Sequence, residues 1–245
     1  MVKSQTKNNS AILLCGHGSR SNTYYKNLIK IKKIIEQKLC LKVFSCFLEI
    51  NKPSLEDCLS KNLDKYNKIF IFPFLIFEGK HFKEDVIRIL KKYDNDFQNI
   101  VFIDKISLLD EILPITLNIL EKKVKKGKNT VLVTSSSYSK DSSVLLNLKK
   151  YTEALTKKLT ISNSFFHYVG QEKEVIKKLK LIENDKLSIL LHPIFLFEGF
   201  LYTKNTKCFY ESFSSKVFAT SSLTNENQIL QIIIEKLVNR IATTN

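Results

Sequence analysis

The sequence predicts an α/β protein in which a mainly parallel sheet is flanked by helices, and it predicts that this arrangement occurs twice in tandem. Two observations lead to this fold class. Short apolar runs alternate along the chain with segments whose apolar residues recur every three or four positions, which is typical of strands alternating with amphipathic helices. In addition, a segment of the first half, beginning at Phe72, recurs in the second half, beginning at His192.

The first half opens with a short apolar strand over residues 11–15, which leads into a helical pattern over residues 25–39. An extended segment over residues 41–49 follows. A helix then runs from Ser54 to about residue 64, because Ser54 is a good N-cap and Asp57 stands three residues later. These elements give the order strand, helix, strand, helix.

The rest of the first half continues this alternation. Residues 69–75 form a near-continuous apolar run, which indicates a strand buried on both faces of a sheet. A helix over about residues 82–93, a strand over residues 100–103 and a helix over residues 109–124 follow. Strands that alternate with helices in this way predict a parallel sheet covered by helices.

The second half repeats the first. Residues 72–79 match residues 192–199, with proline, phenylalanine, glutamate and glycine at four shared positions. Residues 11–15 match residues 130–134 at nearly the same spacing. Two independent matches at comparable spacing indicate an internal duplication.

A short linker, residues 125–129, separates the two copies. We expect an N-terminal domain over residues 1–127 that carries the metal-handling and catalytic residues. The C-terminal domain over residues 128–245 is expected to be a degenerate repeat.

The net charge of +15 could suggest a nucleic-acid-binding protein, but its make-up does not. Arginine is the usual residue for bidentate phosphate and base contacts, and the chain has only Arg20, Arg88 and Arg240. No nucleic-acid-binding motif accompanies the charge. The many lysines either form solvated helix faces or steer an anionic ligand, and both interpretations stay open.

The chain contains no run of about 18 apolar residues, so we expect no membrane span. Its first ten residues are polar and lack the apolar stretch of a secretory signal, so we expect a cytoplasmic protein. The five cysteines include no CxxC pair. We therefore expect reduced thiols, neither a disulfide framework nor a cysteine zinc site.

The first candidate site segment is Gly16-His17-Gly18-Ser19-Arg20, directly after the first strand. Open α/β sheets bind ligands at the carboxyl ends of their parallel strands, and glycines permit a tight turn there. Such a turn can present His17 to a ligand, while Ser19 faces an anion or caps the next helix. The alternative is a turn whose histidine only packs or is solvated.

Two further candidates come to the same edge of the predicted sheet. Glu49 ends the second strand, and His81 follows the third strand, with Asp85 one turn further along the same helix face. Asp85 could orient the imidazole or take up a proton. Two imidazoles and a carboxylate suit a divalent ion such as Co²⁺, Fe²⁺, Ni²⁺ or Zn²⁺. A metallohydrolase could use the same set, so these residues alone leave the reaction open.

Taken together, these segments resemble one family, the class II sirohydrochlorin chelatases, which are relatives of ferrochelatase that act in cobalamin and siroheme synthesis. The resemblance is carried by Gly16-His17-Gly18-Ser19-Arg20, by Phe47-Leu48-Glu49 with Pro53-Ser54, and by Pro73-Phe-Leu-Ile-Phe-Glu-Gly-Lys-His81 with Asp85. It spans residues 11–105 in order and spacing. The duplicated length is similar to the long, two-domain form of the family.

The resemblance implies two flavodoxin-like domains that face each other across a cleft admitting the macrocycle. It implies that His17 and His81 hold the metal and accept pyrrole protons, with Glu49 as a third catalytic residue that acts as auxiliary ligand or base. The substrates would be a divalent metal ion (Co²⁺ or Fe²⁺, with Ni²⁺ as a further candidate) and an anionic tetrapyrrole, with no organic cofactor. We expect a monomer, because the duplication supplies both sides of the cleft. The expected substrate-binding residues are Ser19, Arg20, Lys80 and Asp85.

The second half departs from the family pattern. Serines 135–137 stand where the first half has Gly-His-Gly, and Leu201 stands in place of His81. His167 aligns loosely with the strand-end glutamate, and His192 falls within a predicted buried strand. We therefore expect the C-terminal half to contribute a wall of the cleft without handling metal.

Two alternatives remain at this point. One is a chelatase for another metal or macrocycle, because metal choice depends on availability and affinity order more than on ligand identity. The other is a non-catalytic tetrapyrrole- or metal-binding protein of the same fold.

Overall fold

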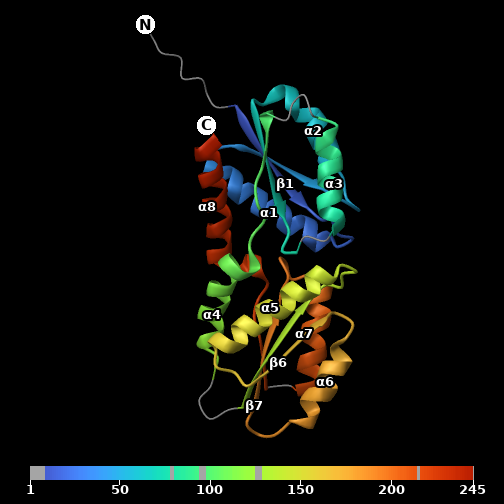
Figure 1. The fold of residues 1–245 in the computed structure, drawn as a ribbon, viewed down its shortest axis with the longest axis vertical. Helices are drawn as coiled ribbons and strands as arrows, with labels where there is room; N and C mark the ends of the chain where they lie inside the picture. The colour runs from blue at the N-terminus through green and yellow to red at the C-terminus, as the bar shows by residue number, and fades with distance from the viewer. Residues whose placement is uncertain (1–8, 78–79, 94–97, 125–128, 214–215, 245) are drawn as a thin grey trace. The chain divides into compact units, whose positions relative to one another are not determined.

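The computed structural model describes residues 9–77, 80–93, 98–124, 129–213 and 216–244, without the side chains of residues 80–83. Within these ranges the strands form two four-stranded sheets, in the orders β2-β1-β3-β4 and β6-β5-β7-β8. All the pairings within both sheets are parallel (Figure 1). The predicted fold class, two parallel sheets flanked by helices, is confirmed.

The strands of the first sheet are β1 (Ser10–Gly16), β2 (Lys42–Phe47), β3 (Lys68–Phe74) and β4 (Ile100–Phe102). Those of the second are β5 (Asn129–Ser136), β6 (Asn163–Tyr168), β7 (Leu187–Pro193) and β8 (Val217–Ala219). The α-helices are α1 (Asn22–Leu39), α2 (Leu55–Asn62), α3 (Lys80–Lys91), α4 (Leu113–Glu121), α5 (Ser142–Lys158), α6 (Glu172–Leu181), α7 (Phe200–Phe213) and α8 (Asn227–Thr244). Turns of 3₁₀ helix cover Leu63–Lys65 and Leu223–Asn225, and a π-helical turn covers Leu108–Ile112.

The two central strands of the first sheet are almost wholly buried. Every residue of β1 is buried, and so is every residue of β3 after its first. One face of this sheet packs against α2 and α3, since Leu13, Leu59 and Val86 belong to one apolar cluster. Burial on both faces accounts for the continuous apolar runs in these strands.

The predicted start of α2 is confirmed by a capping box. The Ser54 hydroxyl accepts a hydrogen bond from the Asp57 backbone N–H at 3.0 Å, and the Asp57 carboxylate accepts one from the Ser54 N–H at 2.9 Å. Such reciprocal bonds satisfy two backbone donors that the first turn of a helix leaves free. These bonds from Ser54 lower the pKa of Asp57 to about 2.

The chain folds into two compact units. Unit 1 comprises residues 1–105 and 232–245, and unit 2 comprises residues 106–231. Helix α4, which follows β4 in the sequence, therefore belongs to unit 2, while most of α8 belongs to unit 1. The predicted domains, 1–127 and 128–245, were drawn at the boundary between the two sequence repeats. They describe the duplication, and as domains they stay a prediction.

Strand register fixes how the two repeats correspond. Pro73 lies opposite Cys15 in the β1–β3 pairing, and Pro193 lies opposite Ser135 in the β5–β7 pairing. If the two prolines correspond, Ser135 corresponds to Cys15, and His17 corresponds to Ser137. The serine run is therefore shifted by one position relative to the sequence alignment. His167 lies opposite Ser135 as Cys46 lies opposite Cys15, so it occupies the position of Cys46 and not that of Glu49.

In the part of the chain that the structure describes, no helix combines the length and the apolar character needed to cross a membrane.

His192 is a core residue of unit 2, as the sequence indicated. Its Nε2 lies 3.1 Å from the Tyr151 hydroxyl and its Nδ1 lies 2.7 Å from the Thr220 hydroxyl. Tyr151 also donates to the Thr116 hydroxyl at 2.7 Å. Burial lowers the pKa of His192 to about 3, because an imidazolium would be costly in this interior.

The stability of the protein should therefore fall in acid. His192 has a lower pKa in the folded chain than in the unfolded one, so its contribution is complete above about pH 6.5 and is lost as the pH falls below it. One such group changes the unfolding free energy by up to about 1.4 kcal/mol per pH unit in this range. We expect His192→Phe, which introduces the residue found at Phe72 in the first repeat, to reduce the slope by that amount.

Urea unfolding of both proteins between pH 7.5 and pH 4.5 measures the two slopes. The comparison concerns slopes alone, because the substitution also removes a partner of Tyr151 and Thr220. Equal slopes for the two proteins would show that His192 is not the group responsible.

Candidate chelatase site

The candidate site lies where β1 and β2 end. Hydrogen bonding between these strands continues past their last residues, with the Leu48 N–H donating to the Gly16 carbonyl at 3.1 Å and the Glu49 N–H to the His17 carbonyl at 3.0 Å. The same ladder brings His17 Nε2 to 3.9 Å from Glu49 Oε2. The two side chains are 59% and 52% exposed, so both are open to an incoming ligand.

Gly18 allows the backbone segment after β1 to lie this close to the segment after β2. Its φ of +103° lies in a region that residues with a side chain rarely adopt. A Cβ at this position would also collide with the backbone carbonyl oxygen of Glu49. A glycine is therefore needed after His17 for two reasons: the backbone conformation of the turn and the lack of space beside the Glu49 carbonyl.

Hydrogen bonds from the backbone of Ser19 and Ser21 to the side chains of Asn51 and Ser19 stabilise the turn. The Ser19 backbone N–H donates to Asn51 Oδ1 at 2.6 Å, and the Ser19 hydroxyl accepts from the Ser21 N–H at 3.1 Å. Ser19 does not cap α1, because the N-cap residue is Ser21, and the Ser19 hydroxyl binds the backbone of that residue just before the helix begins. Asn51 was missed by sequence reasoning, because nothing in the sequence distinguishes it from other loop asparagines.

Tyr24 was also missed. Its ring lies beneath the turn, where a Cβ on Gly16 would meet the Tyr24 hydroxyl. Burial raises the pKa of Tyr24 to about 12, although hydrogen bonding to the backbone of Gly18 and His17 partly opposes this. A neutral phenol in contact with the turn supports the backbone that presents His17.

The structure places the other candidates less completely. His81 and Lys80 lie in the first turn of α3, but their side chains are outside the described residues. Because β1, β2 and β3 are parallel neighbours, the start of α3 follows the same edge of the sheet as His17 and Glu49. Arg20 is exposed in the turn before α1.

Asp85 has a partner that the sequence analysis did not anticipate. Its Oδ1 lies 2.7 Å from Nη2 of Arg88, one turn further along α3. Among the described side chains, no group of three or more histidine, cysteine, aspartate or glutamate residues is arranged to hold a metal ion. Among the described side chains His17 and Glu49 are therefore only a pair, and a third ligand for a metal ion would have to come from outside this set.

A family model matches the part of the chain that carries this pair, and curated relatives match a comparable length of sequence. The CbiX family profile matches residues 11–120. The sirohydrochlorin cobaltochelatases of *Saccharolobus islandicus* and *Saccharolobus solfataricus* are 38% and 36% identical to this chain over 95 residues, which are 38% of this chain and 73% of theirs. The chain belongs to the sirohydrochlorin chelatase family.

Solved chelatase structures match the fold over nearly the whole chain. SirB from *Bacillus subtilis* with Fe³⁺ has a TM-score of 0.75 at 17% identity, over 95% of each chain. SirB in complex with cobalt, from *Bacillus subtilis* subspecies *spizizenii*, has a TM-score of 0.68 at 17% identity, over 96% of this chain and 95% of that one. CbiX of denitrifying bacteria has a TM-score of 0.66 at 11% identity, over 94% and 98%. The fold of both units is therefore a chelatase fold.

The corresponding edge of the sheet in unit 2 is built differently from the edge that carries His17 and Glu49 in unit 1. His167 is buried, its Nδ1 lies 2.9 Å from the Tyr168 carbonyl oxygen, and burial lowers its pKa. Ser135 donates to Asn205 Oδ1 at 2.8 Å inside the core. Among the described residues, no histidine of unit 2 is exposed, since His192 is buried as well.

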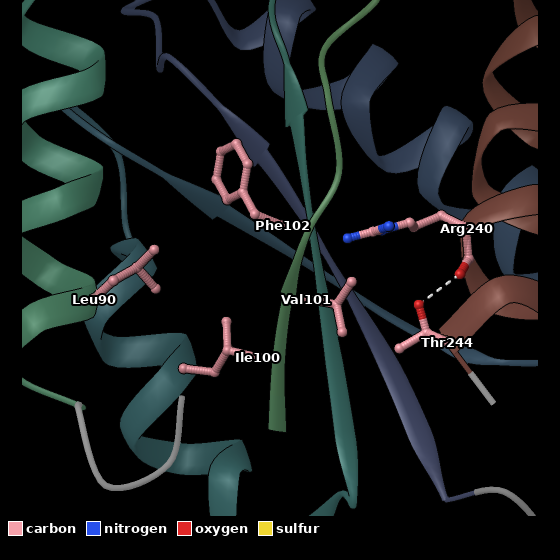
Figure 2. Close-up of a pocket in the computed structure, with 6 residues that line it drawn as sticks. All are labelled: Leu90, Ile100, Val101, Phe102, Arg240 and Thr244. Carbon is pink, nitrogen blue, oxygen red and sulfur yellow. Dashed lines mark hydrogen bonds between the residues drawn. The ribbon is translucent and has the colours of Figure 1, made fainter. Parts of the chain in front are cut away.

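A cavity of about 290 Å³ lies in unit 1, and neither His17 nor Glu49 lines it. It is lined by the edge strand β4 together with Leu90, Arg240 and Thr244, and Figure 2 shows the Arg240 guanidinium extending toward the strand. None of the predicted site residues lines it. The cavity therefore contributes nothing to the assignment of His17 and Glu49.

Replacing Gly18 tests the geometry of the site. We expect Gly18→Ala to destabilise the protein by clearly more than the roughly 1–2 kcal/mol that a left-handed backbone costs a residue with a side chain. The excess comes from the collision with the Glu49 carbonyl. Urea unfolding measures the change.

Gly170→Ala is the matched control. Gly170 has a nearly identical φ of +108°, but a Cβ there would meet no atom within 4 Å. Equal losses of stability in the two variants would contradict the close approach of Gly18 to Glu49.

Proposed function

We propose that this protein inserts a divalent metal ion, Co²⁺ or Fe²⁺, into sirohydrochlorin. The observation that carries the proposal is the exposed pair of His17 and Glu49, whose side chains are 3.9 Å apart at the carboxyl edge of the sheet. This pair lies within residues 11–120, which match the CbiX family model, and sirohydrochlorin cobaltochelatases are 38% identical to this chain over 95 residues. Insertion of cobalt would serve cobalamin synthesis, and insertion of iron would serve siroheme synthesis.

The chemistry of insertion fits an imidazole beside a carboxylate. Two pyrrole N–H protons must leave the macrocycle while a cation enters it. A neutral imidazole near pH 7 can bind the cation or accept a proton, and a carboxylate can do either as well. With both groups within 4 Å, the cation can be released from one while a proton passes to the other.

His81 is proposed as the second imidazole of the site. Its position in the first turn of α3, directly after β3, supports this role, because β3 pairs with β1 along its whole length. Asp85 is on the same helix, but its ion pair with Arg88 already engages one carboxylate oxygen. Its proposed part is therefore to fix the first turns of α3 and, through them, His81.

The basic surface supports an anionic macrocycle as the other substrate. The chain carries a net charge of +15, and sirohydrochlorin is a polycarboxylate. Arg20, Lys80 and Ser19 are the proposed contacts, because they flank the two histidines in the sequence. Long-range attraction of this kind raises the rate of encounter and weakens as salt is added.

Removing either histidine should abolish most of the insertion activity. We expect His17→Ala and His81→Ala each to lower the rate of Co²⁺ insertion at least 100-fold, which is the lower range for loss of a general acid or base. Glu49→Gln should lower it less, about 10-fold or more, since the amide can still ligate but cannot accept a proton. The absorbance change of sirohydrochlorin during insertion measures the rate.

The matched control for Glu49 is Glu56→Gln. Glu56 is another partly exposed glutamate of unit 1, ion-paired with Lys92 directly after α3, and its loss should leave the rate within twofold. A wild-type rate no faster than the uncatalysed one, with both substrates still bound, would favour a non-catalytic tetrapyrrole-binding protein.

Arg20→Ala should weaken binding of the macrocycle more than it slows the chemistry. We expect KM for sirohydrochlorin to rise several-fold with kcat within twofold, and the difference from wild type to shrink in high salt. Arg240→Ala removes the same charge at the cavity beside β4 and should change neither constant. Equal effects of the two variants would assign the attraction to overall charge alone.

A further inference from the structure

Three of the five cysteines converge beneath the candidate site. Cys15 in β1, Cys46 in β2 and Cys58 in α2 belong to one core cluster and are 1%, 0% and 5% exposed. Cys46 lies directly opposite Cys15 in the β1–β2 pairing, and the Cys58 sulfur lies 3.9 Å from the carbonyl oxygen of Ser45, the residue before Cys46. The Cys46 and Cys58 thiols therefore occupy neighbouring positions in the same buried cluster.

We propose that Cys46 and Cys58 form a reversible disulfide under oxidising conditions and that this bond restrains the loop that carries Glu49. The formation of the bond does not depend on the proposed function. Its effect on catalysis does rest on that function, so the two are tested by separate measurements.

Geometry favours this pair over Cys15 with Cys46. Cys15 and Cys46 are directly opposite each other on neighbouring parallel strands, which lie about 4.8 Å apart. Their Cβ atoms point the same way and stay about that far apart, whereas a disulfide requires roughly 3.5–4.5 Å. Cys58 approaches from a helix packed on the face of the sheet, so its Cβ can point toward that of Cys46. The Cys58 thiol lies over β2, with its sulfur 3.9 Å from the Ser45 carbonyl oxygen.

The oxidant required is a small peroxide such as hydrogen peroxide. The Cys58 thiolate attacks one peroxide oxygen and becomes a sulfenic acid, and the departing hydroxide takes up a proton. The sulfur of Cys46 then attacks the Cys58 sulfur, and the sulfenic oxygen leaves as water with the thiol proton. Two thiols and one peroxide thus give one disulfide and two molecules of water.

Cys58 is suited to the first step. The neighbouring Cys46 thiol lowers the pKa of Cys58, while the Cys15 and Cys58 thiols raise the pKa of Cys46. The thiolate is the reactive form of cysteine. Cys58 is also the least buried of the three residues, so it is the one that a peroxide reaches first.

The disulfide would close a loop over residues 47–57. This loop contains Glu49 and also Asn51, which holds the backbone of Ser19. In the reduced protein its two ends are held by non-covalent contacts, such as the hydrogen bond from the Phe47 N–H to the Pro53 carbonyl at 3.0 Å. A covalent link between β2 and α2 would limit the excursions that Glu49 needs in order to serve a metal ion and a proton in turn.

The bond is tested in full-length protein with Cys40→Ser and Cys208→Ser, which leaves only the three buried thiols. After treatment with hydrogen peroxide, we expect the intact mass to fall by two hydrogen atoms. Alkylation after unfolding should then modify one thiol in place of three, and digestion should give a cross-linked peptide pair containing Cys46 and Cys58. A reductant should reverse the change. Cys15→Ala should still form the bond, and Cys58→Ala should not.

Several results would overturn the disulfide. These are a bond between Cys15 and Cys46, oxidation of Cys58 only to the sulfinic or sulfonic acid, and three thiols that remain alkylatable after unfolding under conditions that oxidise Cys40 in the wild type. Cys58 is a buried residue of α2, so the Cys58→Ala variant could fold less stably. Its circular dichroism spectrum is compared with that of the wild type to confirm that the variant folds.

The restraint is tested by amide exchange and by rate. In the oxidised protein, amides of residues 48–56 should exchange at least threefold more slowly, and Co²⁺ insertion should slow at least threefold and recover on reduction. Unchanged exchange and rate with the bond present would refute the restraint alone. If neither form inserts metal, the proposed function fails, while mass and exchange still decide the disulfide.

Discussion

The parallel pairing of β1 with β2 and β3 decides which residues can meet in this protein. Because the three strands run in the same direction, their carboxyl ends reach one edge of the sheet, and the segments that follow them are brought together however far apart they are in the sequence. The hydrogen bond from the Glu49 N–H to the His17 carbonyl extends this pairing beyond the regular strands. The turn at Gly18, the position of Ser19 and the opening of α1 all depend on that extension.

Much of this could be predicted from sequence, because burial leaves a strong pattern there. The apolar runs of β1 and β3 and the Ser54–Asp57 cap of α2 correspond to elements that the structure contains. The boundaries of the elements were predicted less accurately than their order. The predicted helix over residues 109–124 begins as a π-helical turn at Leu108–Ile112, and α4 proper covers only Leu113–Glu121.

Other parts of the site could not be read from the sequence. Tyr24 supports the turn from a helix, and Asn51 supports it from a loop, and neither residue type indicates such a role by itself. The partner of Asp85 was missed because it depends on which rotamers meet on the surface of α3. The correspondence of the two repeats also needed the strand register, since a shift of one residue in a run of serines leaves no trace in the sequence. Duplication thus preserved the sheet while the side chains at its edge diverged, to an exposed pair in unit 1 and a buried network in unit 2.

The division of the chain into compact units has a consequence for biosynthesis. Unit 1 includes residues 232–245, so residues 1–105 lack one helix of their compact unit until residues 232–245 have also been made. Unit 2, which is continuous from residue 106 to residue 231, has no such delay. Contacts of this sequence separation slow folding, and exposed apolar surface in the waiting segment favours aggregation. The unit that carries His17 and Glu49 is therefore the one that waits longer to be completed, and the one for which chaperone assistance during synthesis would matter more.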